Sequence, residues 1–74
     1  PGAMEVKTNL NAWRAKRDIT RAELAGAVDV TRQTITAIET GRYNPSLELA
    51  FELARYFDCD IEDIFVPAER AQGV

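Results

Sequence analysis

Histidine is absent from this chain of 74 residues, and cysteine occurs only once, at Cys59. Zinc sites are built from several histidine and cysteine ligands, and a disulfide needs two cysteines. The sequence therefore predicts no metal site, no internal disulfide and no cofactor. A single cysteine is also typical of proteins in a reducing compartment, so we expect a cytoplasmic location.

Long apolar segments are missing as well. No stretch approaches the roughly 20 apolar residues of a membrane span, and the N-terminus lacks the basic and apolar segments of a secretory signal. There is no glycine-rich phosphate loop and no sequence context that would activate Cys59 as a nucleophile. We therefore expect no enzyme, no catalytic residues and no membrane partner, and no small-molecule ligand is evident.

The formal net charge is −3, which is unusual for a protein that binds nucleic acid. The charge is unevenly distributed, however. Residues 1–44 contain seven Lys and Arg against five acidic residues, and residues 45–74 contain two against seven, which gives local charges of +2 and −5. Because the local field decides where a phosphate backbone docks, the N-terminal half is a candidate DNA-binding surface. The same charges also fit ordinary solvated helix faces.

Apolar residues recur with the helical period, and no segment alternates as a half-buried strand would. Thr20 and Glu23 have the spacing of a capping box, and Gly41 suits the left-handed end of a helix. Further N-caps are expected at Thr31, Ser46 and Asp60. We predict an all-α fold, a compact five-helix bundle, with helices over 8–16, 21–28, 32–40, 47–57 and 61–65.

No linker, repeat or low-complexity tract interrupts the chain, so we expect a single domain over residues 4–66. Residues 1–3 resemble the remnant of a cleaved tag. Residues 67–74 follow the last predicted helix and are expected to form a flexible tail.

A turn of three residues, Asp29-Val30-Thr31, joins the second and third predicted helices, as in a helix-turn-helix whose second helix can enter a DNA major groove. At about 100° per residue, Ile35 and Ile38 mark the buried side of the third helix. The opposite side is free of acidic residues and carries groups that suit contact with base edges. It consists of Gln33, Thr36, Ala37 and Thr40, with Arg32 at its N-terminal flank. Taken singly, each residue is better explained as an ordinary exposed one, and only the set favours base reading.

From Leu10 to Phe65 the sequence resembles the Xre-type, repressor and Cro-like helix-turn-helix transcriptional regulators, especially their short single-domain members. The motifs that carry the resemblance are Thr-Arg-Gln-Thr-Ile at 31–35, Ile-Glu-Thr-Gly-Arg-Tyr-Asn-Pro-Ser at 38–46, and Leu-Ala-Arg-Tyr-Phe at 53–57 running into Ile-Glu-Asp-Ile-Phe at 61–65. The resemblance implies a lambda-repressor-like fold and sequence-specific binding of double-stranded DNA by a transcriptional repressor.

The resemblance also implies roles for single residues. It implies base reading by Arg32, Gln33, Thr36 and Ala37. It implies contacts with the DNA backbone by Arg21, Thr40, Arg42, Tyr43 and Asn44. It implies an ion pair between Arg14 and Glu39, which bridges the first and third helices.

The sequence departs from the family pattern at four positions. Asp18 and Asp29 stand where members usually have glycine at a helix end, Arg21 stands where glutamine is usual, and Thr40 where asparagine is frequent. Because aspartate tolerates left-handed backbone, we expect these helix ends to persist. The departures concern affinity and site preference, since the base-reading face is intact.

The fourth predicted helix is apolar around more of its circumference than one small core requires. Exposed apolar surface marks a partner site, and regulators of this type read two half-sites as symmetric dimers. We therefore expect a homodimer on a palindromic operator. The interface candidates are Leu49, Phe51, Tyr56, Ile61, Ile64 and Phe65. The other explanation is that a small domain packs its aromatic residues beneath its termini.

The main alternative function is that of an antitoxin, which binds a toxin partner and regulates its own operon through the same helix-turn-helix. Such proteins usually carry an additional interaction segment, and residues 66–74 are short for that purpose. A small toxin-like reading frame in the neighbouring gene would favour this alternative.

Overall fold

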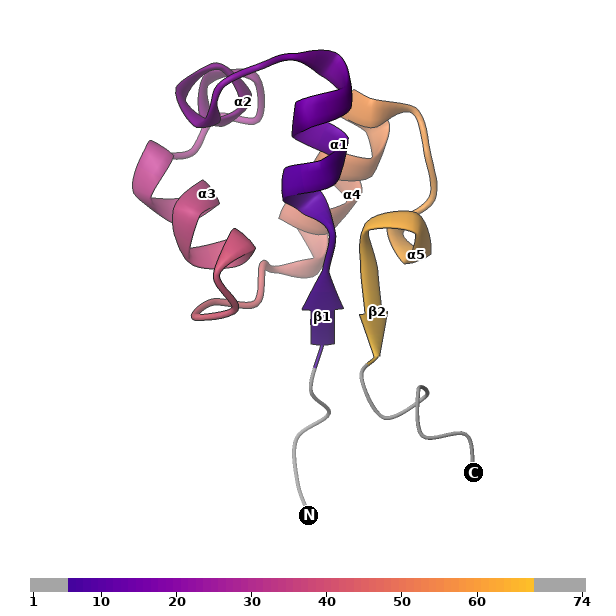
Figure 1. Cartoon of the computed structure of the whole chain (residues 1–74). Helices are drawn as coiled ribbons and strands as arrows, with labels where there is room; N and C mark the ends of the chain where they lie inside the picture. Colours follow the sequence, from indigo (N-terminus) through magenta and orange to yellow (C-terminus); the bar gives the residue numbers. More distant parts are fainter. Residues whose placement is uncertain (1–5, 68–74) are drawn as a thin grey trace.

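Five helices and two short strands make up the protein in a computed structural model that describes residues 6–67 (Figure 1). In chain order the elements are β1 (Val6–Thr8), α1 (Leu10–Arg17), α2 (Arg21–Ala27), α3 (Arg32–Glu39), α4 (Leu47–Phe57), α5 (Ile61–Ile64) and β2 (Phe65–Pro67). The five predicted helices are confirmed. The predicted tag remnant and residues 68–74 of the predicted tail lie outside the described residues.

The two strands were not predicted. They pair antiparallel, with Val6 opposite Pro67 and Thr8 opposite Phe65, and they bring the two ends of the described chain side by side (Figure 1). A strand of three residues is too short to show alternation, and its partner lies at the other end of the sequence. Pro67 is the last residue of β2, a place where a proline, which has no N–H, is tolerated.

The core forms where the helices meet around α4. In Figure 1, α1 crosses in front of α4, with α2 and α3 on one side and α5 on the other. Every helix contributes at least one buried residue, so no helix packs independently of the others. The most deeply buried large side chains are Leu10, Leu24, Ile35, Ile38, Leu53, Phe57 and Ile64.

The predicted N-caps hold the helix starts in place. Thr20 Oγ1 accepts the N–H of Glu23 at 3.0 Å, and Glu23 Oε1 accepts the N–H of Thr20 at 2.8 Å, which completes the capping box. Thr31 accepts from the backbone N–H of Thr34 in the same way. Ser46 caps α4, and at the start of α5 the N–H of Asp60 donates to Asp63 Oδ2. Local signals therefore determine where most of the helices begin.

Aspartate occupies a left-handed conformation after three of the helices. Asp18, Asp29 and Asp58 have φ values of 56°, 61° and 59°, and Gly41 has the same hand with a φ of 81°. The expectation that aspartate preserves these helix ends is confirmed for Asp18 and Asp29. A non-glycine residue in this region carries a steric cost, and a carboxylate at a helix C-terminus opposes the helix dipole.

Replacing Asp58 with glycine is therefore expected to raise the free energy of unfolding by about 1 kcal/mol, because glycine has no Cβ to strain. The measurement is urea denaturation followed by circular dichroism. Asp58→Asn is the matched control, since it removes the charge but keeps a side chain that tolerates this backbone, and we expect a smaller gain. A glycine variant no more stable than the parent would contradict the strain argument.

Long-range hydrogen bonds attach α1 and β1 to the C-terminal segment. Trp13 Nε1 donates to the carbonyl of Asp63 at 3.0 Å, and Thr8 Oγ1 donates to the carbonyl of Ile64 at 2.9 Å. A terminal nitrogen of Arg17 donates to the last carbonyl of α4, at Phe57. These bonds hold α5 and β2 against the bundle, away from α3. None of the helices within residues 6–67 has the length and apolar character needed to cross a membrane.

Candidate nucleic-acid interface

The turn between α2 and α3 fixes the angle between the two helices. The N–H of Val30 donates to the carbonyl of Ala25 at 2.9 Å, across the left-handed Asp29. Val30 packs against the core, and the Thr31 cap starts α3 immediately afterwards. The pair of helices therefore leaves the outer side of α3 uncovered, at the left of Figure 1.

The outer side of α3 is polar and free of acidic groups. Arg32 and Gln33 are exposed and Thr36 and Ala37 are half-buried, whereas Ile35 on the inner side is fully buried. The Thr36 hydroxyl donates to the carbonyl of Arg32 at 3.1 Å, so its oxygen keeps its acceptor capacity and its position is fixed. The four positions predicted for base reading thus share one side of one helix. That side offers a guanidinium, an amide, a hydroxyl and methyl groups.

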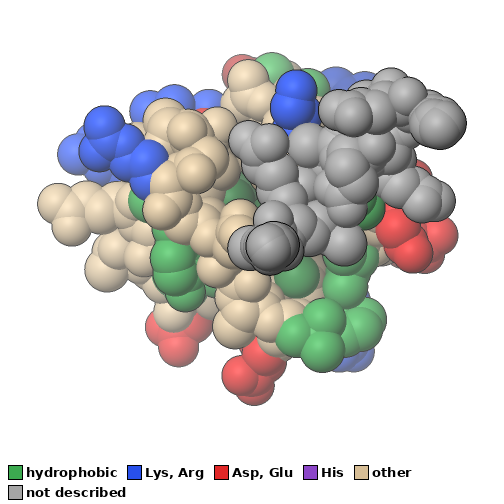
Figure 2. Space-filling model, turned by 90° about the horizontal axis from the view of Figure 1, so that it is seen from below, with side chains coloured by type: hydrophobic (Ala, Val, Ile, Leu, Met, Phe, Trp, Pro, Cys, Tyr) green, Lys and Arg blue, Asp and Glu red, His purple; other side chains and the backbone are tan. Residues whose placement is uncertain are grey.

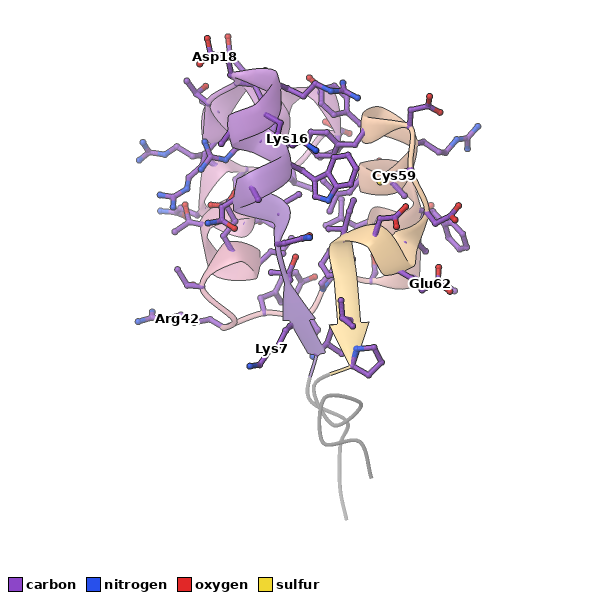
Figure 3. All side chains as sticks on the ribbon, turned by 45° about the vertical axis from the view of Figure 1, so that its right-hand side comes forward. Lys7, Lys16, Asp18, Arg42, Cys59 and Glu62 are labelled. Atoms are coloured by element: carbon purple, nitrogen blue, oxygen red, sulfur yellow. The ribbon has the colours of Figure 1, made fainter. Side chains whose placement is uncertain are left out.

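The loop after α3 continues this surface. The N–H of Arg42 donates to the carbonyl of Ala37 at 2.9 Å across the left-handed Gly41, and this closes the helix end. Thr40 donates its hydroxyl to the carbonyl of Thr36, while Tyr43 and Asn44 are exposed. Figure 3 shows the Arg42 side chain extending from the molecule on the opposite side from Glu62. The residues predicted to touch the DNA backbone therefore border the α3 face.

A carboxylate with two arginine partners lies behind this surface. Arg14 Nε donates to Glu39 Oε2 at 2.8 Å and Arg21 Nε donates to Glu39 Oε1 at 2.9 Å. Another Arg14 nitrogen lies 3.3 Å from Glu39 Oε1, and a third donates to the carbonyl of Ile19. The Glu39 side chain is only 2% exposed, although its backbone lies near the surface. One carboxylate thus joins α1, α2 and α3.

The contact between Arg21 and Glu39 was missed at the level of sequence. Arg21 was predicted to touch DNA and Glu39 to pair with Arg14 alone. The two residues lie 18 positions apart on different helices, and no periodicity or cap motif links them. Only the packing of α2 on α3 brings them together.

Three of the six residues predicted for a dimer interface are not available at the surface. Leu49 and Phe65 are each 8% exposed and Ile64 is fully buried. The prediction was wrong for Ile64 and Phe65 because α5 and β2 fold back over the bundle and cover their own apolar residues. It was wrong for Leu49 because this residue of α4 lies beside the turn between α2 and α3, where it lines a groove with Asp29 and Val30. Of the other three candidates, Phe51 and Tyr56 are exposed and Ile61 is half-buried.

An apolar groove of about 520 Å³ lies beside Phe51. Val6, Ala54, Ile61 and Pro67 line it, and the Phe51 ring at its edge is 51% exposed. Charged residues of both signs also line it, namely Arg55, Asp60 and Glu62. Figure 2, which views the molecule from the strand end, shows hydrophobic side chains gathered at the lower right and Lys and Arg side chains at the left.

Cys59 lines the same groove without the chemistry of a reactive thiol. Burial raises the pKa of its thiol above the ordinary value, and the carboxylates of Asp63, Asp60 and Asp58 raise it further. The thiol therefore stays protonated at neutral pH. Within residues 6–67, no group of three or more His, Cys, Asp or Glu side chains is arranged to hold a metal ion.

A helix-turn-helix family model matches residues 10–64. The chain is 49% identical over 61 residues to an HTH-type transcriptional regulator of Archaeoglobus fulgidus, covering 82% of this chain and 86% of that protein. A regulator of the same description from Methanocaldococcus jannaschii is also 49% identical, with 82% and 92% covered. Among solved structures, the transcriptional regulator VanUg superposes with a TM-score of 0.72 at 28% identity, over 90% of this chain and 92% of that one.

Proposed function

Since the chain belongs to the Xre/Cro-like helix-turn-helix family of DNA-binding transcriptional regulators, we propose that it is a repressor that binds a palindromic operator as a homodimer, with α3 in the major groove. The observation that carries this proposal is the uncovered, acid-free face of α3. Arg32 and Gln33 pair through two hydrogen bonds with guanine and adenine, respectively. Thr36 and Ala37 offer a hydroxyl and methyl groups to the neighbouring bases.

Contacts with the DNA backbone come from the border of this face. Arg21 lies at the start of α2, and Arg42, Tyr43 and Asn44 lie on the loop after α3. These contacts are independent of sequence, and they fix the position of α3 in the groove. Among the acidic residues of the C-terminal half, Glu62 lies on the opposite side of the molecule from Arg42, whereas Glu48 and Glu52 line a groove with Tyr43. The face of α3 itself carries no acidic residue, and the local charge matters more for docking than the net charge of −3.

The partner that we assign to the apolar groove is a second copy of the chain. The groove and the exposed Phe51 ring lie side by side, so in a two-fold interface each ring can enter the groove of the other protomer. The rim carries one arginine beside two acidic residues, which is also self-complementary. A toxin would need a complementary surface of its own, and the self-complementarity favours a second copy over the antitoxin alternative.

Selecting bound sites from a random pool of duplex DNA tests the proposal. We expect two inverted half-sites whose centres lie about one helical turn apart, because two α3 helices in a symmetric dimer enter successive major grooves. Recovery of single, unpaired sites would contradict the dimer, and recovery of no preferred sequence would contradict base reading.

Arg42→Ala is expected to weaken binding by a similar factor on every DNA sequence, since a phosphate contact carries no sequence information. The slope of log affinity against log salt should become shallower by about 0.9, the value for one lost phosphate contact. Fluorescence anisotropy across a salt series, on one selected site and one scrambled site, measures both effects. A loss confined to the selected site would instead make Arg42 a base-reading residue.

A further inference from the structure

Glu39 has one more arginine partner than a bridge between two helices needs. Arg14 already bonds to both carboxylate oxygens and to the carbonyl of Ile19. Arg14 is 19% exposed and belongs to the interior of the bundle, whereas the Arg21 side chain is 42% exposed. Arg21 adds little to the union of α1 and α3, because it projects from α2. Its contact with Glu39 calls for another explanation.

The Arg21 guanidinium is engaged on one edge only. Its Nε donates inward to Glu39 Oε1 at 2.9 Å, and its two terminal nitrogens have no hydrogen-bond partner within residues 6–67. A guanidinium is planar with donors on both sides of the fork. Fixing Nε therefore fixes the direction of the outer donors, and this direction is what recognition of a phosphate requires.

The Arg21 side chain lines a groove of about 570 Å³ together with Arg32, which flanks the proposed base-reading face. Its lining includes Arg14, Arg21 and Arg32 against a single acidic residue, Asp18, so its charge is positive. The two arginines and Glu39 together retain a charge of +1, and Glu39 itself is covered. An approaching anion therefore meets donors and not the carboxylate.

We propose that Glu39 is the positioning residue for DNA backbone contact, because it holds Arg21 by Nε so that the two terminal nitrogens bind one phosphate. This inference rests on the proposed function, since it assumes that α3 docks in the groove next to Arg21. The two arginines therefore have different roles. Arg14 holds the Glu39 carboxylate in place, and Arg21, oriented by that carboxylate, binds the DNA phosphate.

Lysine at position 21 distinguishes orientation from charge. A lysine ammonium keeps the charge, but its three donors share one nitrogen on a flexible stem, so it cannot be held at one edge by Glu39 while a fixed pair of donors faces the phosphate. We expect Arg21→Ala to lower affinity for selected duplex DNA about tenfold and to flatten the salt slope by about 0.9. Arg21→Lys should lose nearly as much. The matched controls are Arg42→Ala and Arg42→Lys. The Arg42 side chain is exposed and is not held by a partner within residues 6–67, so Arg42→Lys should recover most of the affinity that Arg42→Ala loses, whereas Arg21→Lys should not.

A double-substitution cycle tests Glu39 itself. Glu39→Gln, at a temperature where circular dichroism shows it folded, should weaken DNA binding severalfold when Arg21 is present and by less than about twofold in the Arg21→Ala background. If Glu39→Gln lowers DNA affinity by the same factor with Arg21 and with Ala at position 21, Glu39 acts only on the fold, and the proposal is overturned. If Glu39→Gln does not fold, the comparison of lysine with alanine at position 21 decides alone. Full affinity of Arg21→Lys overturns this inference and leaves the proposed function standing, whereas a parent protein that selects no DNA overturns both.

Discussion

Replacing Glu39 with alanine is expected to lower the free energy of unfolding by about 3 kcal/mol, which is a large fraction of the stability of a domain of this size. The carboxylate is 2% exposed and has an arginine partner on each oxygen. Its removal leaves Arg14, itself mostly covered, without an anion. The penalty comes from that uncompensated charge, since a covered ion pair adds little net stability when it is intact.

Urea denaturation followed by Trp13 fluorescence measures this loss, because Trp13 packs against Phe57 with ring centroids 5.7 Å apart. Glu52→Ala is the control: the same deletion at an exposed glutamate that has no ion pair within residues 6–67 should change stability by less than about 0.5 kcal/mol. An unchanged midpoint for Glu39→Ala would mean that the two arginines do not depend on this carboxylate.

Phe51→Glu is expected to convert the dimer into a folded monomer and to lower affinity for a DNA with two half-sites on the order of 100-fold, through loss of avidity. The ring is 51% exposed, so its replacement leaves the core intact. In the proposed interface, however, a carboxylate would enter an apolar groove without a partner, which is costly.

Leu47→Glu introduces the same charge on the same helix, at a side chain that is 70% exposed and lies outside the groove. Because Leu47 lies one helical turn from Phe51 but outside the groove, Leu47→Glu should weaken the dimer less than Phe51→Glu does. Because the charge of the C-terminal half is −5, added salt should tighten self-association while it loosens DNA binding. Sedimentation equilibrium at low and high salt is the measurement, and a parent protein that stays monomeric at tens of micromolar in both would contradict the interface.

Local chemistry explains which features could be predicted from the sequence. The caps at Thr20, Thr31 and Ser46 and the left-handed Gly41 depend on residues within four positions of one another, so the helices could be placed to within two residues. The polar face of α3 follows from the helical period in the same way. These features can be predicted because all the residues that form each of them lie within about one helical turn of one another in the sequence, so tertiary packing does not alter them.

Features that depend on tertiary packing could not be predicted. The strands β1 and β2 meet through residues more than 50 positions apart, as in the bond from Thr8 to Ile64. Arg21 reaches Glu39 only because α2 packs on α3. The sequence predicted Ile64 and Phe65 to be exposed apolar residues, but the packing of α5 and β2 on the bundle buries both side chains in the core. The apolar surface that remains is therefore smaller than predicted and centres on Phe51.

Selecting sites from a random DNA pool with the parent protein and with Gln33→Ala tests most directly whether α3 reads the operator. We expect Gln33→Ala to lose base preference at one position of each half-site, with the other positions unchanged, at a cost of about 1–3 kcal/mol on the parent's preferred site. Gln33 is exposed, so the fold should be unaffected. The same preferred sequence and the same affinity for both proteins would contradict the account, since another surface would then read the DNA.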